Sequence, residues 1–127
     1  MAISPSGFEE HQKALLEKTA DKIVEQLDAK IIERATNQLL DICRITYFDT
    51  EEPLNKVCEE VCYRYLRNGW SEVCYKIEKV QSETYNWIVK YVFLTESNRK
   101  KWNDSTDSEG FSTDSEGFIS VTKVKNR

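Results

Sequence analysis

A long amphipathic stripe near the start of the chain constrains its fold more than any other feature. Apolar residues recur at helical spacing, and neither Gly nor Pro interrupts residues 8–48. A continuous helix over this stretch would be roughly 60 Å long, whereas a compact domain of this size has a radius of gyration of about 14 Å. The helix must therefore break, or project from its domain and need a partner. The stripe contains Leu16, Ala20, Ile23, Leu27, Ile31, Ala35, Leu39 and Ile42.

The start of this helix carries a capping signal. Ser6 and Glu9 have the spacing of a capping box, which predicts a helix beginning at residue 7. The stripe extends the predicted helix to residue 46. If it breaks, we expect the break near Asp28 or near Thr36 and Asn37, because these residue types are weaker helix formers.

A second helix is predicted over residues 50–68. Asp49 or Thr50 can act as its N-cap, and Pro53 falls in the first turn, where a missing N–H group costs nothing. Gly69 follows the last apolar position and is typical of a helix stop.

Residues 70–94 fit two structures. Val73, Tyr75 and Ile77 alternate with polar or smaller residues, and residues 84–93 are rich in aromatic and β-branched types, which favours a hairpin. The same region also carries an apolar stripe at helical spacing from Val73 to Leu94, and periodicity alone cannot choose between the two. We favour the hairpin because residues 118–124 resemble a further strand, which needs a sheet to join.

The expected fold is therefore α+β and a single domain over residues 1–127. The two helices pack on a small antiparallel sheet made of the hairpin and a C-terminal strand within the basic tail 118–127. The alternative is an all-α fold with residues 71–98 as a third helix. Residues 103–117 lie in a polar, acidic segment in which one seven-residue sequence occurs twice in tandem, at 105–111 and 112–118. This composition predicts an exposed loop.

Composition excludes some function classes. The net charge of −4 predicts no dominant basic surface, which disfavours generic nucleic-acid binding. We find neither an apolar signal segment at the N-terminus nor an apolar run long enough to span a membrane. We therefore expect four reduced cysteines in an intracellular, reducing compartment, either the cytoplasm or a virion.

The chain contains no catalytic or cofactor motif that we can identify. Cys58 and Cys62 lie one helical turn apart on an apolar face, but the chain has a single histidine and no CxxC, so core packing is favoured over a metal site. No glycine-rich phosphate loop is present, and we expect no cofactor. A carboxylate-based enzyme has no motif to support it, so we expect a protein without catalytic activity.

The stripe points to assembly as the function, since a helix that outreaches its domain buries its apolar face elsewhere, usually by self-association. The chain would then be a structural or interaction protein, such as a subunit of a virion or other complex. The expected interface residues are Leu16, Ile23, Leu27, Ile31 and Leu39. The alternative is a nucleic-acid-binding module with an aromatic and basic sheet face, using Trp87, Tyr91, Arg99, Lys100 and Lys101.

Overall fold

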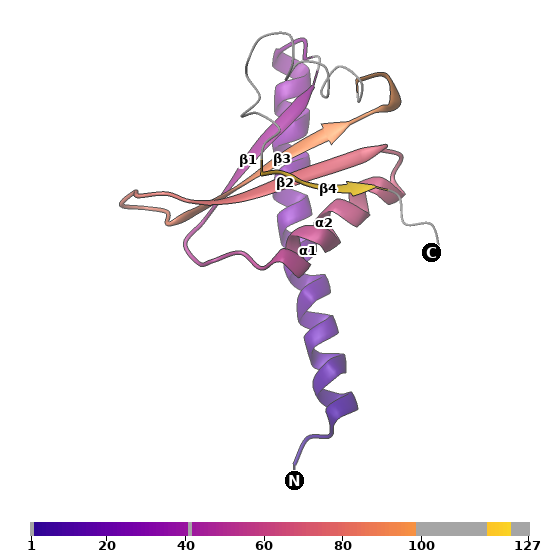
Figure 1. Cartoon of the computed structure of the whole chain (residues 1–127), viewed down its shortest axis with the longest axis vertical. Helices are drawn as coiled ribbons and strands as arrows, with labels where there is room; N and C mark the ends of the chain where they lie inside the picture. The colour runs from indigo at the N-terminus through magenta and orange to yellow at the C-terminus, as the bar shows by residue number, and fades with distance from the viewer. Residues whose placement is uncertain (1, 41, 99–116, 123–127) are drawn as a thin grey trace.

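Two helices cover one face of a four-stranded antiparallel sheet, in an α+β fold (Figure 1). The structure, a computed structural model, describes residues 2–40, 42–98 and 117–122. The sequence-based prediction of the fold class is confirmed. In chain order the elements are α1 (Pro5–Asn37), β1 (Cys43–Asp49), α2 (Asn55–Arg67), β2 (Glu72–Lys79), β3 (Trp87–Leu94) and β4 (Ile119–Thr122).

The sheet has the strand order β1-β3-β2-β4, with each neighbouring pair antiparallel. Strands β1 and β2 therefore run parallel to each other on either side of β3, and α2 connects them. Across the sheet, Ile45 lies opposite Tyr91, Tyr91 opposite Tyr75, and Tyr75 opposite Ile119. Ile45, Tyr91 and Tyr75 belong to the core cluster shared with the helices, which places this row on the helix-covered face.

The hairpin prediction is confirmed, and the all-α alternative for residues 71–98 is wrong. The helical stripe in this region is incidental, because β3 is apolar on both faces rather than on one. Tyr91 and Phe93 face the helices, while Val92 and Leu94 are buried in a smaller cluster on the other side. A helix would leave part of this apolar surface in water, whereas a central strand buries it.

The prediction that the first helix extends to residue 46 is wrong in its last part. Helix α1 ends at Asn37, which confirms the second of the two expected break points. Residues 43–49 instead form β1, a strand that the sequence analysis did not predict. Its β-branched and aromatic residues gain a full hydrogen-bonded ladder with β3, and Ile45 enters the core.

The helix starts also differ from the predictions. The N-cap of α1 is Ser4 rather than Ser6, and its hydroxyl accepts a 3.1 Å hydrogen bond from the Gly7 N–H. Helix α2 begins at Asn55 rather than at residue 50, because Asp49 is the last residue of β1. The Asp49 carboxylate accepts a 3.1 Å hydrogen bond from the Glu51 N–H and so stabilises the turn between the two elements.

The C-terminal strand prediction is confirmed by β4, as far as Thr122. Residues 123–127 of the predicted tail lie outside the described residues, as does the acidic repeat at 103–117 except for Gly117. The predicted stop after α2 is confirmed as well, since Gly69 follows that helix with a φ of 112°.

Candidate interaction surface

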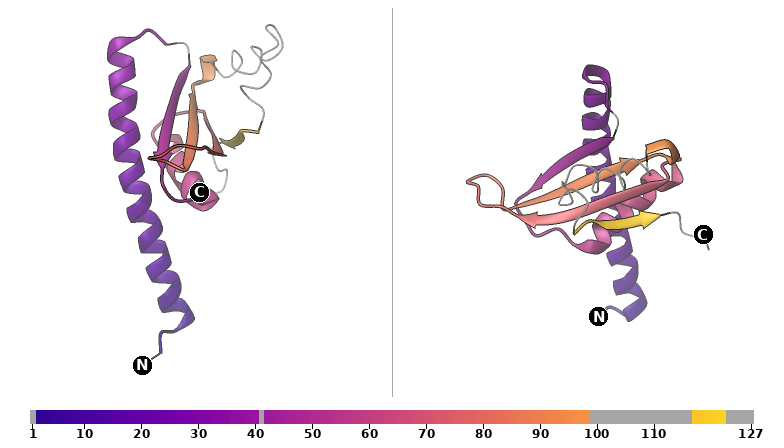
Figure 2. Two further views of the ribbon diagram at one scale, coloured as in Figure 1. Left: turned by 90° about the vertical axis from the view of Figure 1, so that its left-hand side faces the viewer. Right: turned by 45° about the horizontal axis from the view of Figure 1, so that its top comes forward.

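Helix α1 is buried only along one side of its middle part, and its N-terminal part is exposed. Ala20, Ile23 and Leu27 are buried in the core between the sheet and the helices. N-terminal to them, the helix projects beyond the sheet and α2 (Figure 2). Its 33 residues span about 50 Å, whereas an eight-residue strand spans about 27 Å, so the domain cannot cover the whole helix.

Contacts between the two helices fix the point where α1 leaves the domain. The Arg64 guanidinium on α2 forms an ion pair with Asp21 on α1, and it donates a 3.0 Å hydrogen bond to Glu60. Two turns further along α1, Tyr65 donates to Asp28. Arg64 also donates a 3.3 Å hydrogen bond to the backbone carbonyl of Glu17, so α2 holds α1 from Glu17 onwards.

Two large apolar side chains lie exposed on the projecting half. Phe8 is 57% exposed and Leu15 is 58% exposed. They are seven residues apart, so they lie on the same face of the helix, with Gln12 between them. This face continues directly into a groove, because Gln12 and Leu15 also line it.

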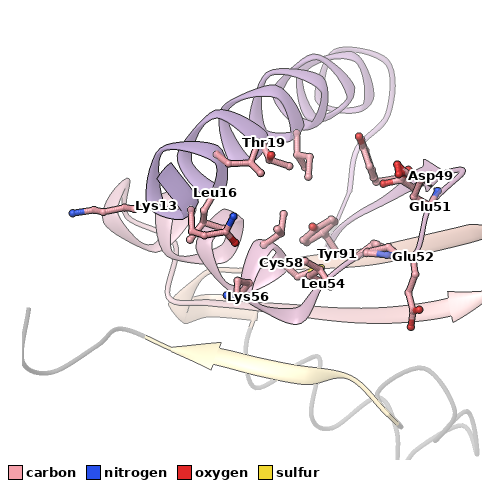
Figure 3. A pocket seen from close by; sticks show the side chains of 17 residues that line it. Lys13, Leu16, Thr19, Asp49, Glu51, Glu52, Leu54, Lys56, Cys58 and Tyr91 are labelled. Atoms are coloured by element: carbon pink, nitrogen blue, oxygen red, sulfur yellow. Dashed lines mark hydrogen bonds between the residues drawn. The ribbon is translucent and has the colours of Figure 1, made fainter. Parts of the chain in front are cut away.

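The groove has a volume of about 430 Å³ and lies between α1, the β1–α2 connection and the first turn of α2 (Figure 3). Its walls are apolar, with Leu16 and Ile23 from α1 and Val57 from α2. Leu54, at the start of α2, adds a further exposed apolar side chain to its edge. Burying most of the groove surface against a partner would therefore be energetically favourable.

Charged side chains are distributed unequally along the groove. Asp49, Glu51 and Glu52 from the end of β1 and the following loop lie at one end, and Lys13 of α1 lies towards the other (Figure 3). Lys56 lies on the α2 side. The groove thus has an acidic end, formed by the end of β1 and the loop that follows it.

The inner end of the groove holds two protonated polar groups. The Tyr91 hydroxyl is buried beside the Cys58 thiol and, among the described residues, makes no hydrogen bond of normal geometry. Burial raises the pKa of Cys58 to about 11 and raises the pKa of Tyr91 well above its ordinary value. The thiol is therefore protonated at neutral pH and is not an activated nucleophile.

The five residues predicted as an interface do not form one surface. Ile23 and Leu27 are core residues of the domain itself, and Ile31 packs against the same core. Leu16 is partly exposed and lines the groove. Leu39 is fully exposed beyond the end of α1, beside a second hollow of about 460 Å³ at the opposite end of the helix.

The residues of the alternative nucleic-acid face are also separated. Tyr91 is fully buried under the helices, so its ring cannot stack on a base, and that part of the hypothesis is corrected by the structure. Trp87 is partly exposed, with the Lys79 ammonium 5.8 Å from the centre of its ring. Arg99, Lys100 and Lys101 lie outside the described residues.

The sequence analysis missed Phe8, Leu15 and Leu54. The signal that could have identified the first two is their two-turn spacing on a face about 100° away from the buried stripe. That face contains fewer apolar residues than the longer stripe, which therefore dominates the sequence pattern. The middle of that stripe, however, is buried by the domain itself, while Phe8 and Leu15 on the shorter face remain exposed.

Other kinds of site have less support in the described part of the chain. Cys58 and Cys62 are buried, which confirms the prediction that they pack in the core. No disulfide joins any of the four cysteines. Within residues 2–40, 42–98 and 117–122, no three His, Cys, Asp or Glu side chains are grouped as metal ligands would be. Neither α1 nor α2 is both long and apolar enough to serve as a membrane-spanning helix.

Comparisons of the chain with known protein families, with curated proteins and with solved structures found no match.

Proposed function

We propose that this chain is a non-catalytic assembly protein that associates with itself through the projecting half of α1 and the adjoining groove. The observation that carries the proposal is the division of α1. Residues in the middle of the helix, from Ala20 to Leu27, pack in the domain core, while the N-terminal part presents Phe8 and Leu15 to water beside an apolar groove. No described residue of the domain covers the face of α1 that carries Phe8 and Leu15.

The grouping of exposed apolar side chains supports this function. A single exposed leucine is ordinary on a protein surface. Phe8 and Leu15, however, are each more than half exposed on one face of α1, and Leu54, which is also more than half exposed, lines the groove together with Leu15. Exposed apolar patches mark interaction sites in soluble proteins. Symmetric self-association is the commonest way in which soluble chains bury such patches.

The experiment is sedimentation equilibrium over a range of protein concentrations. We expect a mass above the 14.9 kDa of one chain that declines on dilution. Leu15→Glu should shift the protein towards the monomer. The matched control is Ile32→Glu, because Ile32 is 63% exposed on the other half of the same helix and should leave the association unchanged. A monomer at every concentration would overturn the proposal.

A further inference from the structure

We propose that the inner part of the groove binds a small organic amine, a molecule with an apolar body, an ammonium group at one end and a carbonyl oxygen towards the other. The inference goes beyond the proposed self-association. That function uses the exposed face of α1 beside the groove, whereas this site lies within a single copy of the chain. The apolar walls, a buried hydroxyl without a partner, and carboxylates without a cation together support it.

The shape and lining of the groove suit a small molecule. Side chains from α1, the β1–α2 connection, α2 and β3 line it, and its volume is about 430 Å³. Sites for small molecules measure about 300–1,000 Å³ and are mostly apolar, with a few polar groups that fix the orientation of the ligand. Ile23 on α1, Val57 on α2 and Val89 on β3 give the inner part of the groove this apolar character. These walls would hold the hydrocarbon body of the ligand.

The hydroxyl of Tyr91 lies at the inner end of the groove and has no hydrogen-bond partner among the described residues. The side chain is fully buried, and Figure 3 shows it among the side chains that line the groove between the two helices. The neighbouring Cys58 offers only a sulfur atom, which is a weak acceptor. A buried donor without a partner is unfavourable, and a carbonyl oxygen on a bound molecule would remove this cost.

The acidic end of the groove favours a cation. Asp49, Glu51 and Glu52 line this end, and none of the three forms an ion pair with another described residue. Asp49 is half-buried, and its carboxylate is close enough to Tyr47 to contribute to the raised pKa of that side chain. An ammonium group here would be attracted to the carboxylates, whereas a negatively charged group would be repelled.

The two polar features together fix the orientation of the ligand. The ammonium group lies at Asp49, the carbonyl oxygen accepts from the Tyr91 hydroxyl, and the apolar body lies against the walls between them. Lys13 and Lys56 line other parts of the groove, so the positive end of the molecule is directed to the acidic end. A fatty carboxylate would suit the walls but not the charge, and a simple alkylamine would leave the Tyr91 hydroxyl unpaired.

The test is isothermal titration calorimetry on the full chain with three probes. Methyl 6-aminohexanoate carries an ammonium group and an ester carbonyl, octylamine has a chain of the same length without the carbonyl, and octanoate has the opposite charge. We expect both amines to bind more tightly than octanoate. Failure of both amines to bind, or octanoate that binds as tightly as octylamine, would overturn the inference.

Asp49→Asn tests the charge at the acidic end. The variant should weaken the binding of both amines about fivefold, while its amide oxygen can still accept from the Glu51 N–H. The matched control is Glu33→Gln, because Glu33 is an exposed carboxylate on the C-terminal part of α1 and does not line the groove. Equal affinities for the amines in the wild type and in Asp49→Asn would contradict the assignment of the ammonium site.

Tyr91→Phe tests the carbonyl contact. The variant should weaken the binding of methyl 6-aminohexanoate about tenfold and leave that of octylamine unchanged, since only the ester uses the hydroxyl. A general disturbance of the groove would weaken both probes equally, and this result would overturn the assignment. Circular dichroism checks that the variant is folded. Sedimentation of the same proteins without probe reports their oligomeric state, so a failure of ligand binding is distinguished from a failure of self-association.

Discussion

The hydroxyl of Tyr65 on α2 donates a 2.8 Å hydrogen bond to the carboxylate of Asp28 on α1. The same hydroxyl lies 3.3 Å from the backbone carbonyl of Val24, one turn earlier on α1. The Tyr65 ring packs edge-on against Phe93 of β3, with 4.8 Å between the ring centres. One side chain therefore links both helices to the sheet and fixes how α1 crosses the domain.

Removing this hydroxyl should lower the stability of the domain without disturbing its packing. In Tyr65→Phe the ring remains against Phe93, but α1 loses its hydrogen bond. We expect the free energy of unfolding to fall by about 0.5–1.5 kcal/mol, measured by urea denaturation. Tyr63→Phe is the control, because the described residues show no hydrogen bond to the Tyr63 hydroxyl. An equal loss in both variants would contradict the role given to Tyr65.

The division of α1 predicts opposite effects for the same substitution at two positions. Ile23→Asp places an unpaired carboxylate in the core, which costs several kcal/mol, and should unfold the monomer. Leu15→Asp changes an exposed side chain and should leave the thermal midpoint of the monomer nearly unchanged. Thermal unfolding of dilute samples, followed by circular dichroism, distinguishes the two. Similar midpoints for both variants would show that the division is wrong.

The sequence predicted the elements that local signals specify. The helix stop at Gly69 was predictable from residue type, because glycine reaches positive φ. The break at Thr36 and Asn37 was one of two that weak helix formers indicated, and the helix continues through the other, at Asp28. Strand β1 was not predictable in this way. Its residues continue the spacing of the helical stripe, and they become a strand because pairing with β3 offers a ladder that sequence alone does not reveal.

The interaction surface was predictable only in outline. The length of the stripe predicted that the helix breaks or projects, and α1 both ends at Asn37 and projects, but periodicity could not show which part projects. That depended on α2, whose Arg64 and Tyr65 hold α1 from Glu17 onwards. Local sequence patterns do not reveal long-range contacts of this kind. Ile23 and Leu27 in the middle of the longest apolar stripe were therefore assigned to a partner, although they are buried in the domain itself.

The turn after α2 gives a prediction about backbone conformation. Gly69 has a φ of 112°, and a Cβ at this position would meet nothing within 4 Å. Any loss of stability in Gly69→Ala must therefore come from the backbone conformation and not from a steric clash. We expect the free energy of unfolding to fall by about 1 kcal/mol in urea denaturation. Gly69→Asn should lose less, since asparagine adopts positive φ more readily than alanine.

The buried thiols predict that stability falls at alkaline pH. Burial raises the pKa of Cys58 from 9.0 to about 11, and raises the pKa of Cys62 as well. Between pH 9 and about pH 11 the unfolded chain releases protons that the folded chain keeps. The free energy of unfolding therefore decreases as pH rises through this window and is unaffected by these groups below it.

Urea denaturation at a series of pH values between 7 and 10.5 measures this effect. We expect a constant midpoint up to about pH 8.5 and a declining one above it, because the unfolded thiols ionise near this pH. Cys58→Ala should be less stable at pH 7 but should show a shallower decline, since one of the groups responsible is gone. Burial also raises the pKa of Tyr75 and Tyr91, so part of the slope should persist in this variant. A slope identical to that of the wild type would mean that the Cys58 thiol ionises equally in both states.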